Sequence, residues 1–457
     1  MWLLIKNLQR SRVFRGVSSN MYVQLTQIFS QVALVPVMAT YWGLTTYGVW
    51  LLLFSIPGYL ALTDLGISRA ATAEMISYVA RNEHSKAVAT YRAARVLTLV
   101  ASGLGLLLVI SLSFTVFYQD LNENYAIVGY DVALVLSLLA LYGIITLQNG
   151  VTNAAYTASG AYALSGYIVG TMFAAETISA IIIVASGGGI ATVALSYVVI
   201  RALGTGMFSL IARRIAPWLF GEHSVSWRDH VAQLVRPALA LVFGSVAQAI
   251  SIQGTVAAVG FVAGAAMVPV FTTVRTLSRI AIQAIMIVNH AIMPSFSAAM
   301  ATDDRARTRE LMTTSVIVTL ICSTAVLVPA ALLGPWFIEF WTNGAVRPGN
   351  AILIAMTGAA FINTLWTPIS NLIMAINLQE RFAYAYLAAS LAGLLICFPL
   401  TSAFGATGAA ISVLAVDLFM LLWIVPLARK IGVLNLRDLV HDIPRVLQRV
   451  TAFARNG

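Results

Sequence analysis

Long apolar stretches separated by short polar connections run along almost the whole chain. The apolar runs reach about 20 residues or more and lack the period-two alternation of strands, which indicates helices that cross a membrane. Twelve spans are predicted, at residues 18–40, 46–66, 94–117, 131–153, 164–186, 190–211, 237–257, 266–292, 312–334, 351–375, 384–403 and 408–428.

Composition agrees with this pattern. Of the 457 residues, 60% are hydrophobic and 10% are charged, with a mean hydropathy of +0.87. A soluble globular chain carries roughly a quarter charged residues. The composition therefore excludes a water-soluble enzyme, a disordered tail and a nucleic-acid-binding domain, despite the net charge of +10. It predicts an all-α, polytopic membrane protein.

The basic residues are divided unequally between the two sides of these spans. Of the 27 Lys and Arg residues, 23 fall at the termini and in connections on one side, and the opposite connections hold only Arg347. Positive charge gathers on the cytoplasmic side of membrane proteins. Both termini are therefore predicted to be cytoplasmic. The three remaining arginines, Arg201, Arg275 and Arg279, lie within spans.

Weak internal repetition suggests two halves of six spans. A shift of 216 residues aligns Gly189 with Gly405 and Arg213 with Arg429, and a shift of 221 aligns Gln27 with Gln248. Because each half has an even number of spans, the halves should have the same orientation, with a substrate site between them. The predicted organisation is a lobe at 1–217, a cytoplasmic linker at 218–236, a second lobe at 237–430 and a tail at 431–457.

Two segments outside the spans carry recognisable patterns. The largest outer loop, predicted at 335–350, contains Trp336, Phe337 and Trp341, which suit the headgroup level of a membrane. The tail from Val433 places apolar residues on one helical face with arginines opposite, although a proline interrupts it. This pattern predicts either a segment lying on the inner leaflet or simple positive anchoring.

Polar stripes mark three of the spans. Arg275 and Arg279 are four residues apart on one face of span 8, and Gln283 continues that face. Span 1 carries glutamines at helical spacing, including the candidates Gln27 and Gln31, and span 7 carries the candidate Gln248 among serines and a threonine. Intramembrane charge is costly and usually faces a wet cavity. The functional interpretation is a cationic cavity between the halves, and the alternative is polar contact that joins helices.

Four further charged residues have two interpretations each. Glu176 and Arg201 lie in adjoining spans and could form a structural ion pair, while Asp417 aligns with Arg201 under the shift of 216. Asp417 and Glu176 are also candidates for a carboxylate that couples transport to protons or another cation. Asp64 could cap a helix locally or act as a gate.

The excess of arginine favours an anionic ligand. Two guanidinium groups four residues apart repel each other unless an anion bridges them, and Arg matches phosphate oxygens well. No Walker sequence, catalytic motif or cluster with metal-ligand spacing is present in the sequence, and Cys322 and Cys397 lie inside apolar runs. We therefore expect no cofactor, no metal and no enzymatic activity.

Several short motifs resemble the polysaccharide-transporter branch, the Wzx-type flippases, of the multidrug/oligosaccharidyl-lipid/polysaccharide exporter superfamily. They are Tyr47-Gly48-Val49-Trp50, Asp64-Leu65-Gly66, Pro294-Ser295-Phe296 and Gly405-Ala406-Thr407-Gly408. The resemblance implies two six-helix lobes in a V shape like that of multidrug exporters, with spans 1, 2, 7 and 8 around a central cavity. The resemblance implies no particular charged residues within the membrane. Arg275, Arg279 and Asp417 are therefore candidates on the sequence pattern alone.

The function implied is a flippase in the bacterial inner membrane. It would move undecaprenyl-diphosphate-linked oligosaccharide units to the outer leaflet by alternating access, for surface polysaccharide synthesis. The expected partners are that lipid-linked substrate, membrane lipids, protons or sodium ions, and polysaccharide polymerase and chain-length proteins, with no nucleic acid. The alternatives are a cation-coupled multidrug antiporter and a membrane polysaccharide polymerase or ligase.

Overall fold

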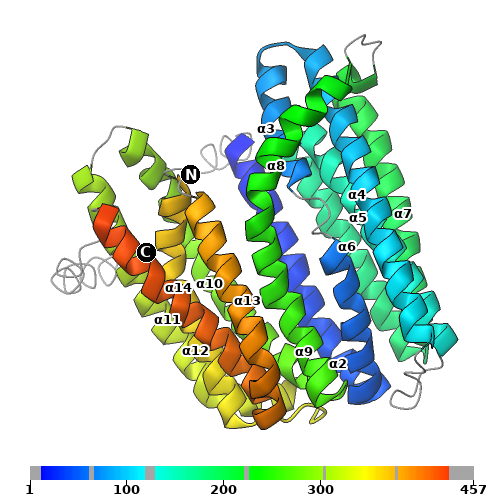
Figure 1. The fold of residues 1–457 in the computed structure, drawn as a ribbon, viewed down its shortest axis with the longest axis vertical. Coiled ribbons are helices and arrows are strands. Elements are labelled where there is room, and N and C mark those ends of the chain that lie inside the picture. The colour runs from blue at the N-terminus through cyan, green and yellow to red at the C-terminus, as the bar shows by residue number, and fades with distance from the viewer. Residues whose placement is uncertain are drawn as a thin grey trace, which may run out of the picture. The chain divides into compact units, whose positions relative to one another are not determined.

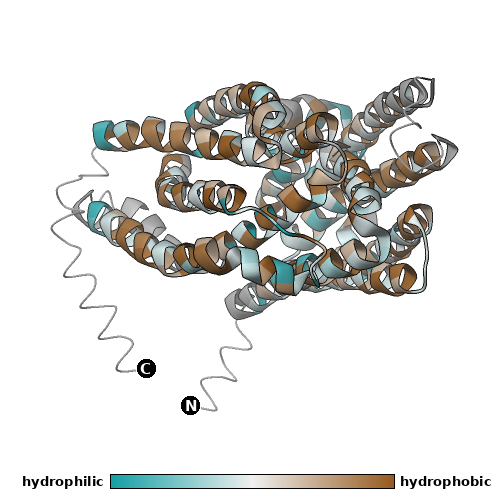
Figure 2. Ribbon diagram, turned by 90° about the horizontal axis from the view of Figure 1, so that it is seen from below, coloured by the Kyte–Doolittle hydropathy of each residue, from teal (hydrophilic) through white to brown (hydrophobic). Residues whose placement is uncertain are grey.

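The computed structural model describes residues 12–60, 66–118, 129–220, 226–301, 305–375 and 379–431, and these residues are helical apart from short connections. Nine helices in this part of the chain are long and apolar enough to cross a membrane. Hydrophobic residues run along them, as Figure 2 shows. The all-α, polytopic fold class is therefore confirmed.

The helices fall into two compact units, residues 1–245 and 246–457, and the boundary lies within α8. The N-terminal unit contains α2 (Arg12–Leu60), α3 (Ile67–Ala80), α4 (His84–Tyr118), α5 (Gly129–Ala158), α6 (Tyr162–Ala185), α7 (Ile190–Ile215), the short helix η3 (Pro217–Phe220) and most of α8 (Arg228–Ala249) (Figure 1). The C-terminal unit contains the π-helical turn η4 (Ile250–Gly254), α9 (Thr255–Ala263), α10 (Met267–Ala301), α11 (Arg305–Trp341), α12 (Asn350–Ala375), α13 (Gln379–Phe404) and α14 (Ala406–Ile431).

Each unit has its own apolar core. In the N-terminal unit, Tyr156 of α5 stacks on Phe208 of α7 with ring centroids 4.4 Å apart, and its hydroxyl donates to the Phe208 carbonyl. In the C-terminal unit, the fully buried Met420 and Ile424 of α14 pack with Trp366 of α12. Burial of such side chains against neighbouring helices fixes how the helices within one unit pack.

The helix bounds repeat between the units. Adding 216 to the bounds of α7 gives those of α14, and adding 221 to the first residue of α4 gives that of α11. Gly43, where α2 breaks into two helices, and Gly264, which ends α9, are also 221 residues apart. Both have positive φ, 73° and 86°, a conformation that glycine adopts without steric cost. The repetition inferred from a few identities thus extends to helix lengths and turn geometry.

Three elements differ from the predicted spans. The helix α3 was not predicted, since its 14 residues are too few to cross a membrane. The helix α11 continues to Trp341, so Trp336 and Phe337 lie on a helix and not in the predicted outer loop. Pro335, interpreted as the start of that loop, is accommodated inside the helix, as prolines in membrane helices often are. The helix α8 begins within the stretch predicted as a linker.

Candidate functional site

A cavity of about 290 Å³ lies within the C-terminal unit and brings together most of the polar residues predicted there. All of its lining residues come from α8, η4, α10, α12, α13 and α14. Its polar lining consists of Gln248, Ser251, Arg275, Ser278, Arg279, Gln283, Asn363, Tyr386 and Asp417. The predicted cationic cavity was expected between the halves, and the one described here is built by one unit alone.

Arg275 is held by the π-helical turn. Its guanidinium Nη1 donates to the Ile252 carbonyl (2.9 Å) and to the Thr255 hydroxyl (3.0 Å), and Nη2 donates to the Ser251 carbonyl (3.0 Å). A π-helical turn departs from the α-helical hydrogen-bond pattern and often occurs at functional sites. The side chain of Arg275 therefore ties α10 to the wall of the cavity at η4.

Arg279 and Gln283 make fewer polar contacts than Arg275. In the part of the chain that the structure describes, Arg279 makes no hydrogen bond or ion pair, and the residue is exposed where it lines the cavity. The Oε1 atom of Gln283 is buried and has no hydrogen-bond partner. One turn of α10 thus places in the lining of this cavity a cation without a partner and an amide that no described residue binds.

Asp417, on α14, is buried and also lines this cavity. One of its oxygens, Oδ1, accepts hydrogen bonds from Asn363 Nδ2 (2.9 Å) and from Trp366 Nε1 (3.2 Å). It also attracts Arg275 electrostatically. Among the described residues, however, no basic group lies within 4.0 Å of this carboxylate. Both hydrogen-bond donors are neutral, so its charge is stabilised but not paired.

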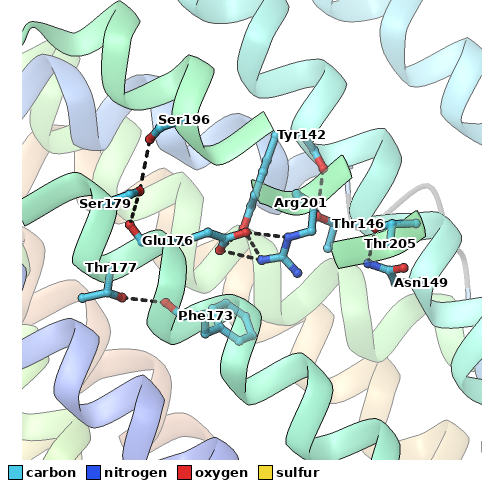
Figure 3. A network of polar contacts seen from close by, with 10 residues as sticks. All are labelled: Tyr142, Thr146, Asn149, Phe173, Glu176, Thr177, Ser179, Ser196, Arg201 and Thr205. Carbon is cyan, nitrogen blue, oxygen red and sulfur yellow. Dashed lines mark hydrogen bonds and ion pairs between the residues drawn. The ribbon is translucent and has the colours of Figure 1, made fainter. Parts of the chain in front are cut away.

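The N-terminal unit contains the predicted ion pair between Glu176 and Arg201 (Figure 3). Arg201 of α7 contacts both oxygens of Glu176 of α6, with Nε–Oε1 and Nη2–Oε2 distances of 2.7 Å. The Tyr142 hydroxyl accepts from Arg201 and donates to Glu176. The rings of Tyr142 and Phe173 lie 4.9 and 5.1 Å from the guanidinium carbon. Every charge in this cluster is compensated, which is the geometry of a structural ion pair.

Two other candidates belong to the N-terminal unit and are not among the lining residues of this cavity. Gln27 and Gln31 lie on α2 in the N-terminal unit, and Gln31 Oε1 is buried without a hydrogen-bond partner. Asp64 and the tail from residue 432 lie outside the described residues. Within those residues no group of His, Cys, Asp and Glu could hold a metal ion.

Sequence reasoning missed the residues that support these charges. Asn363 and Trp366 bind Asp417, Tyr142 binds both Arg201 and Glu176, and the backbone of η4 binds Arg275. Asn363 could have been found as an amide inside an apolar span. The backbone carbonyls of η4 leave no signal in a sequence, because every residue has one.

Comparisons with known proteins identify the fold. No protein-family model and no curated protein matches the sequence. Among solved structures, an inward-facing multidrug resistance MATE family transporter of the MOP superfamily has a TM-score of 0.68, covering 93% of this chain and 95% of that chain at 14% identity. The lipid II flippase MurJ in an inward closed conformation also gives 0.68, covering 96% and 92% at 12% identity.

A Vibrio cholerae MATE transporter gives a TM-score of 0.57, covering 91% of this chain and 97% of that chain at 14% identity. These identities are too low to transfer a substrate from one protein to another. The similarity in fold extends over nearly the whole chain in each case. The chain therefore has the multi-pass helical membrane fold of the MOP superfamily transporters.

Proposed function

We propose that the protein is a flippase that moves lipid-diphosphate-linked oligosaccharide units across the bacterial inner membrane by alternating access, with both termini in the cytoplasm. The observation that carries the proposal is the cavity lined by Arg275 and Arg279, in which Arg279 has no partner among the described residues. A free guanidinium in a polar cavity attracts an anionic ligand, and its planar set of donors suits phosphate oxygens.

The charge balance of the cavity supports an anion over a cation. Two arginines face one carboxylate, Asp417, and the interaction of Asp417 is with Arg275. Glu176, which would have added negative charge, is paired with Arg201 in the other unit. A solved relative in fold is named a lipid II flippase, which agrees with a lipid-linked ligand.

The proposal is tested in a strain whose surface polysaccharide depends on this protein. The double variant Arg275→Ala/Arg279→Ala should lose the polymer at an unchanged level of protein in the membrane. Arg214→Ala, an exposed arginine near the end of α7, is the matched control and should keep it. Normal polymer in the double variant contradicts the proposal.

A second candidate is a cation-coupled multidrug antiporter of the same fold. The observation in its favour is Asp417, a buried carboxylate whose hydrogen-bond donors are neutral and which lines the cavity. Two of the solved relatives described above are MATE transporters. This candidate predicts drug resistance on overexpression, lost in Asp417→Asn, while the flippase predicts no resistance.

The remaining features of the proposal concern partners and energy. We expect protons or sodium ions as coupling ions, and membrane lipids, a polymerase and chain-length proteins as partners in the pathway. We do not expect enzymatic activity, cofactors or nucleic acid. Co-purification of the tagged protein from its own membranes, followed by mass spectrometry, tests the protein partners.

A further inference from the structure

Arg279 and Gln283 lie on one face of α10 and line the same cavity. Among the described residues, Arg279 has no counter-charge and the side-chain amide of Gln283 has no hydrogen-bond partner. The residues are four apart, so their side chains lie on the same face about one helical turn, roughly 5.4 Å, from each other. Arg279 offers donors and a positive charge, and Gln283 Oε1 is a buried acceptor without a donor. Buried polar atoms are nearly always hydrogen-bonded to protein or ordered water, so the side-chain amide of Gln283, which no described residue binds, is available to a group that enters the cavity.

The other charged residues of the cavity leave this face available. Arg275 donates its hydrogen bonds to the carbonyls of Ser251 and Ile252 and to the Thr255 hydroxyl. Its charge is partly offset by Asp417. Among the described residues, no acidic group lies within 4.0 Å of Arg279. The net positive charge of the cavity therefore lies at Arg279, beside Gln283.

We infer that Arg279 and Gln283 together bind a single sugar unit that carries an anionic group next to a hydroxyl group. The guanidinium of Arg279 donates to the anion, and the side-chain amide of Gln283 forms a hydrogen bond with the sugar hydroxyl. The inference rests on the proposed function and names the part of the substrate that this cavity holds. A volume of about 290 Å³ is at the small end of ligand sites and is enough for one sugar residue.

The anionic group can be a phosphate on the sugar or a carboxylate within it. Both groups accept paired hydrogen bonds from a guanidinium. In both cases a neighbouring sugar hydroxyl forms the second contact, with Gln283. Probes that differ in one feature each therefore separate the two sources of charge and the contribution of the sugar.

The experiment uses the purified full-length protein in detergent and measures thermal stabilisation by four probes: glucose 1-phosphate, glucuronate, inorganic phosphate and glucose. A ligand that binds the folded state raises the melting temperature according to its affinity. At least one of the two sugar anions should bind roughly tenfold more tightly than inorganic phosphate and glucose. Whether glucose 1-phosphate or glucuronate does so identifies the anion.

Variants assign the two contacts. Arg279→Ala should abolish binding of the preferred sugar anion. Gln283→Leu should reduce it to the affinity of the anion without the sugar, and Gln283→Glu, which keeps the shape but adds a negative charge, should abolish it. Two controls from the N-terminal unit should leave binding unchanged: Arg214→Ala, and Gln148→Leu, a glutamine whose side-chain atoms are also buried without hydrogen bonds.

Several outcomes overturn the inference. They are equal affinity for probes with and without the sugar, unchanged binding in both Gln283 variants, and absence of any binding by the wild-type protein. The proposed function fails separately. Normal surface polysaccharide in the Arg275→Ala/Arg279→Ala strain, together with binding of the sugar anion by the purified wild-type protein, overturns the flippase and leaves the sugar site. Loss of the polymer in that strain, with no preference among the probes by the wild-type protein, overturns the sugar site and leaves the flippase.

Discussion

Arg201 and Asp417 hold the same place in their helices, each 11 residues after the first residue of α7 or α14. Among the described residues, only Arg201 has an oppositely charged partner in hydrogen-bond contact. In the N-terminal unit, Glu176 compensates the charge at this position. In the C-terminal unit the charge is held by two neutral donors and faces a cavity. Equivalent positions of the two units thus both carry a charge, but the charge is ion-paired in the N-terminal unit and lines a cavity in the C-terminal unit.

The compensated pair should contribute to stability and not to transport directly. Arg201→Ala or Glu176→Ala leaves one buried charge unpaired, which costs about 3–5 kcal/mol. A double variant, Arg201→Met/Glu176→Leu, removes both charges and should recover most of that loss. The measurement is thermal unfolding of the purified protein. Single variants as stable as the wild type would contradict a structural role.

The position of Asp417 leads to a different expectation. Asp417→Asn keeps an oxygen that can accept from Asn363 and Trp366, so the protein should fold with a change in stability of less than about 1 kcal/mol. If this carboxylate exchanges a proton during transport, the dependence of the transport rate on pH should disappear. A variant that retains the pH profile of the wild type excludes Asp417 as the coupling group.

The contact between Arg275 and the π-helical turn predicts a local change in dynamics. Arg275→Ala removes three hydrogen bonds to η4 and Thr255. Amide hydrogen exchange at residues 250–256 should therefore accelerate by about tenfold, as expected for a loss of roughly 1.4 kcal/mol. Arg279→Ala has no such contacts and should leave the exchange unchanged. Equal exchange in the two variants would show that Arg275 does not hold the turn.

A pH effect is expected at α3, outside the candidate membrane spans. Burial raises the pKa of Glu74 above its usual 4.5, while nearby His230 opposes this, and the Oε2 atom of Glu74 is buried without a hydrogen-bond partner. The folded protein therefore binds a proton at this carboxyl more tightly than the unfolded chain does. The free energy of unfolding should fall as the pH rises from about 4.5 through the pKa in the folded state.

Glu74→Gln supplies the test of this pH effect. It mimics the protonated carboxyl at every pH, so it should remove the slope and make the protein more stable than the wild type at neutral pH. Melting temperatures measured between pH 4 and 8 report both effects. The opposite sign, with the wild type gaining stability as the pH rises in that range, would contradict the burial of this carboxyl.

The sequence predicted the membrane helices well because a run of about 20 apolar residues matches the thickness of a bilayer. Span 6 was predicted at 190–211 and α7 covers Ile190–Ile215, and span 12 was predicted at 408–428 and α14 covers Ala406–Ile431. Helix ends were less accurate, since helices such as α4 continue past the apolar run into polar residues. The helix α3 has no long apolar run at all, so hydropathy could not find it.

The candidate site was predictable only in part. The spacing of Arg275, Arg279 and Gln283 placed them on one face, and the structure puts all three on one cavity. Their different roles could not be predicted, because these depend on which neighbours each side chain reaches. The carbonyls of the π-helical turn satisfy Arg275, and no described residue satisfies Arg279. Such contacts depend on tertiary packing, and the identity of a single residue does not show which neighbours it will contact.

Translocation by the purified protein in liposomes tests the central proposal most directly. The vesicles contain a fluorescent undecaprenyl-diphosphate-linked sugar, and a membrane-impermeant quencher reports how much of it reaches the outer leaflet. The wild type and Arg214→Ala should move the lipid at the same rate, and Arg279→Ala should be slower by roughly tenfold or more. Equal rates for Arg279→Ala and the wild type, or wild-type vesicles no faster than protein-free ones, would contradict it.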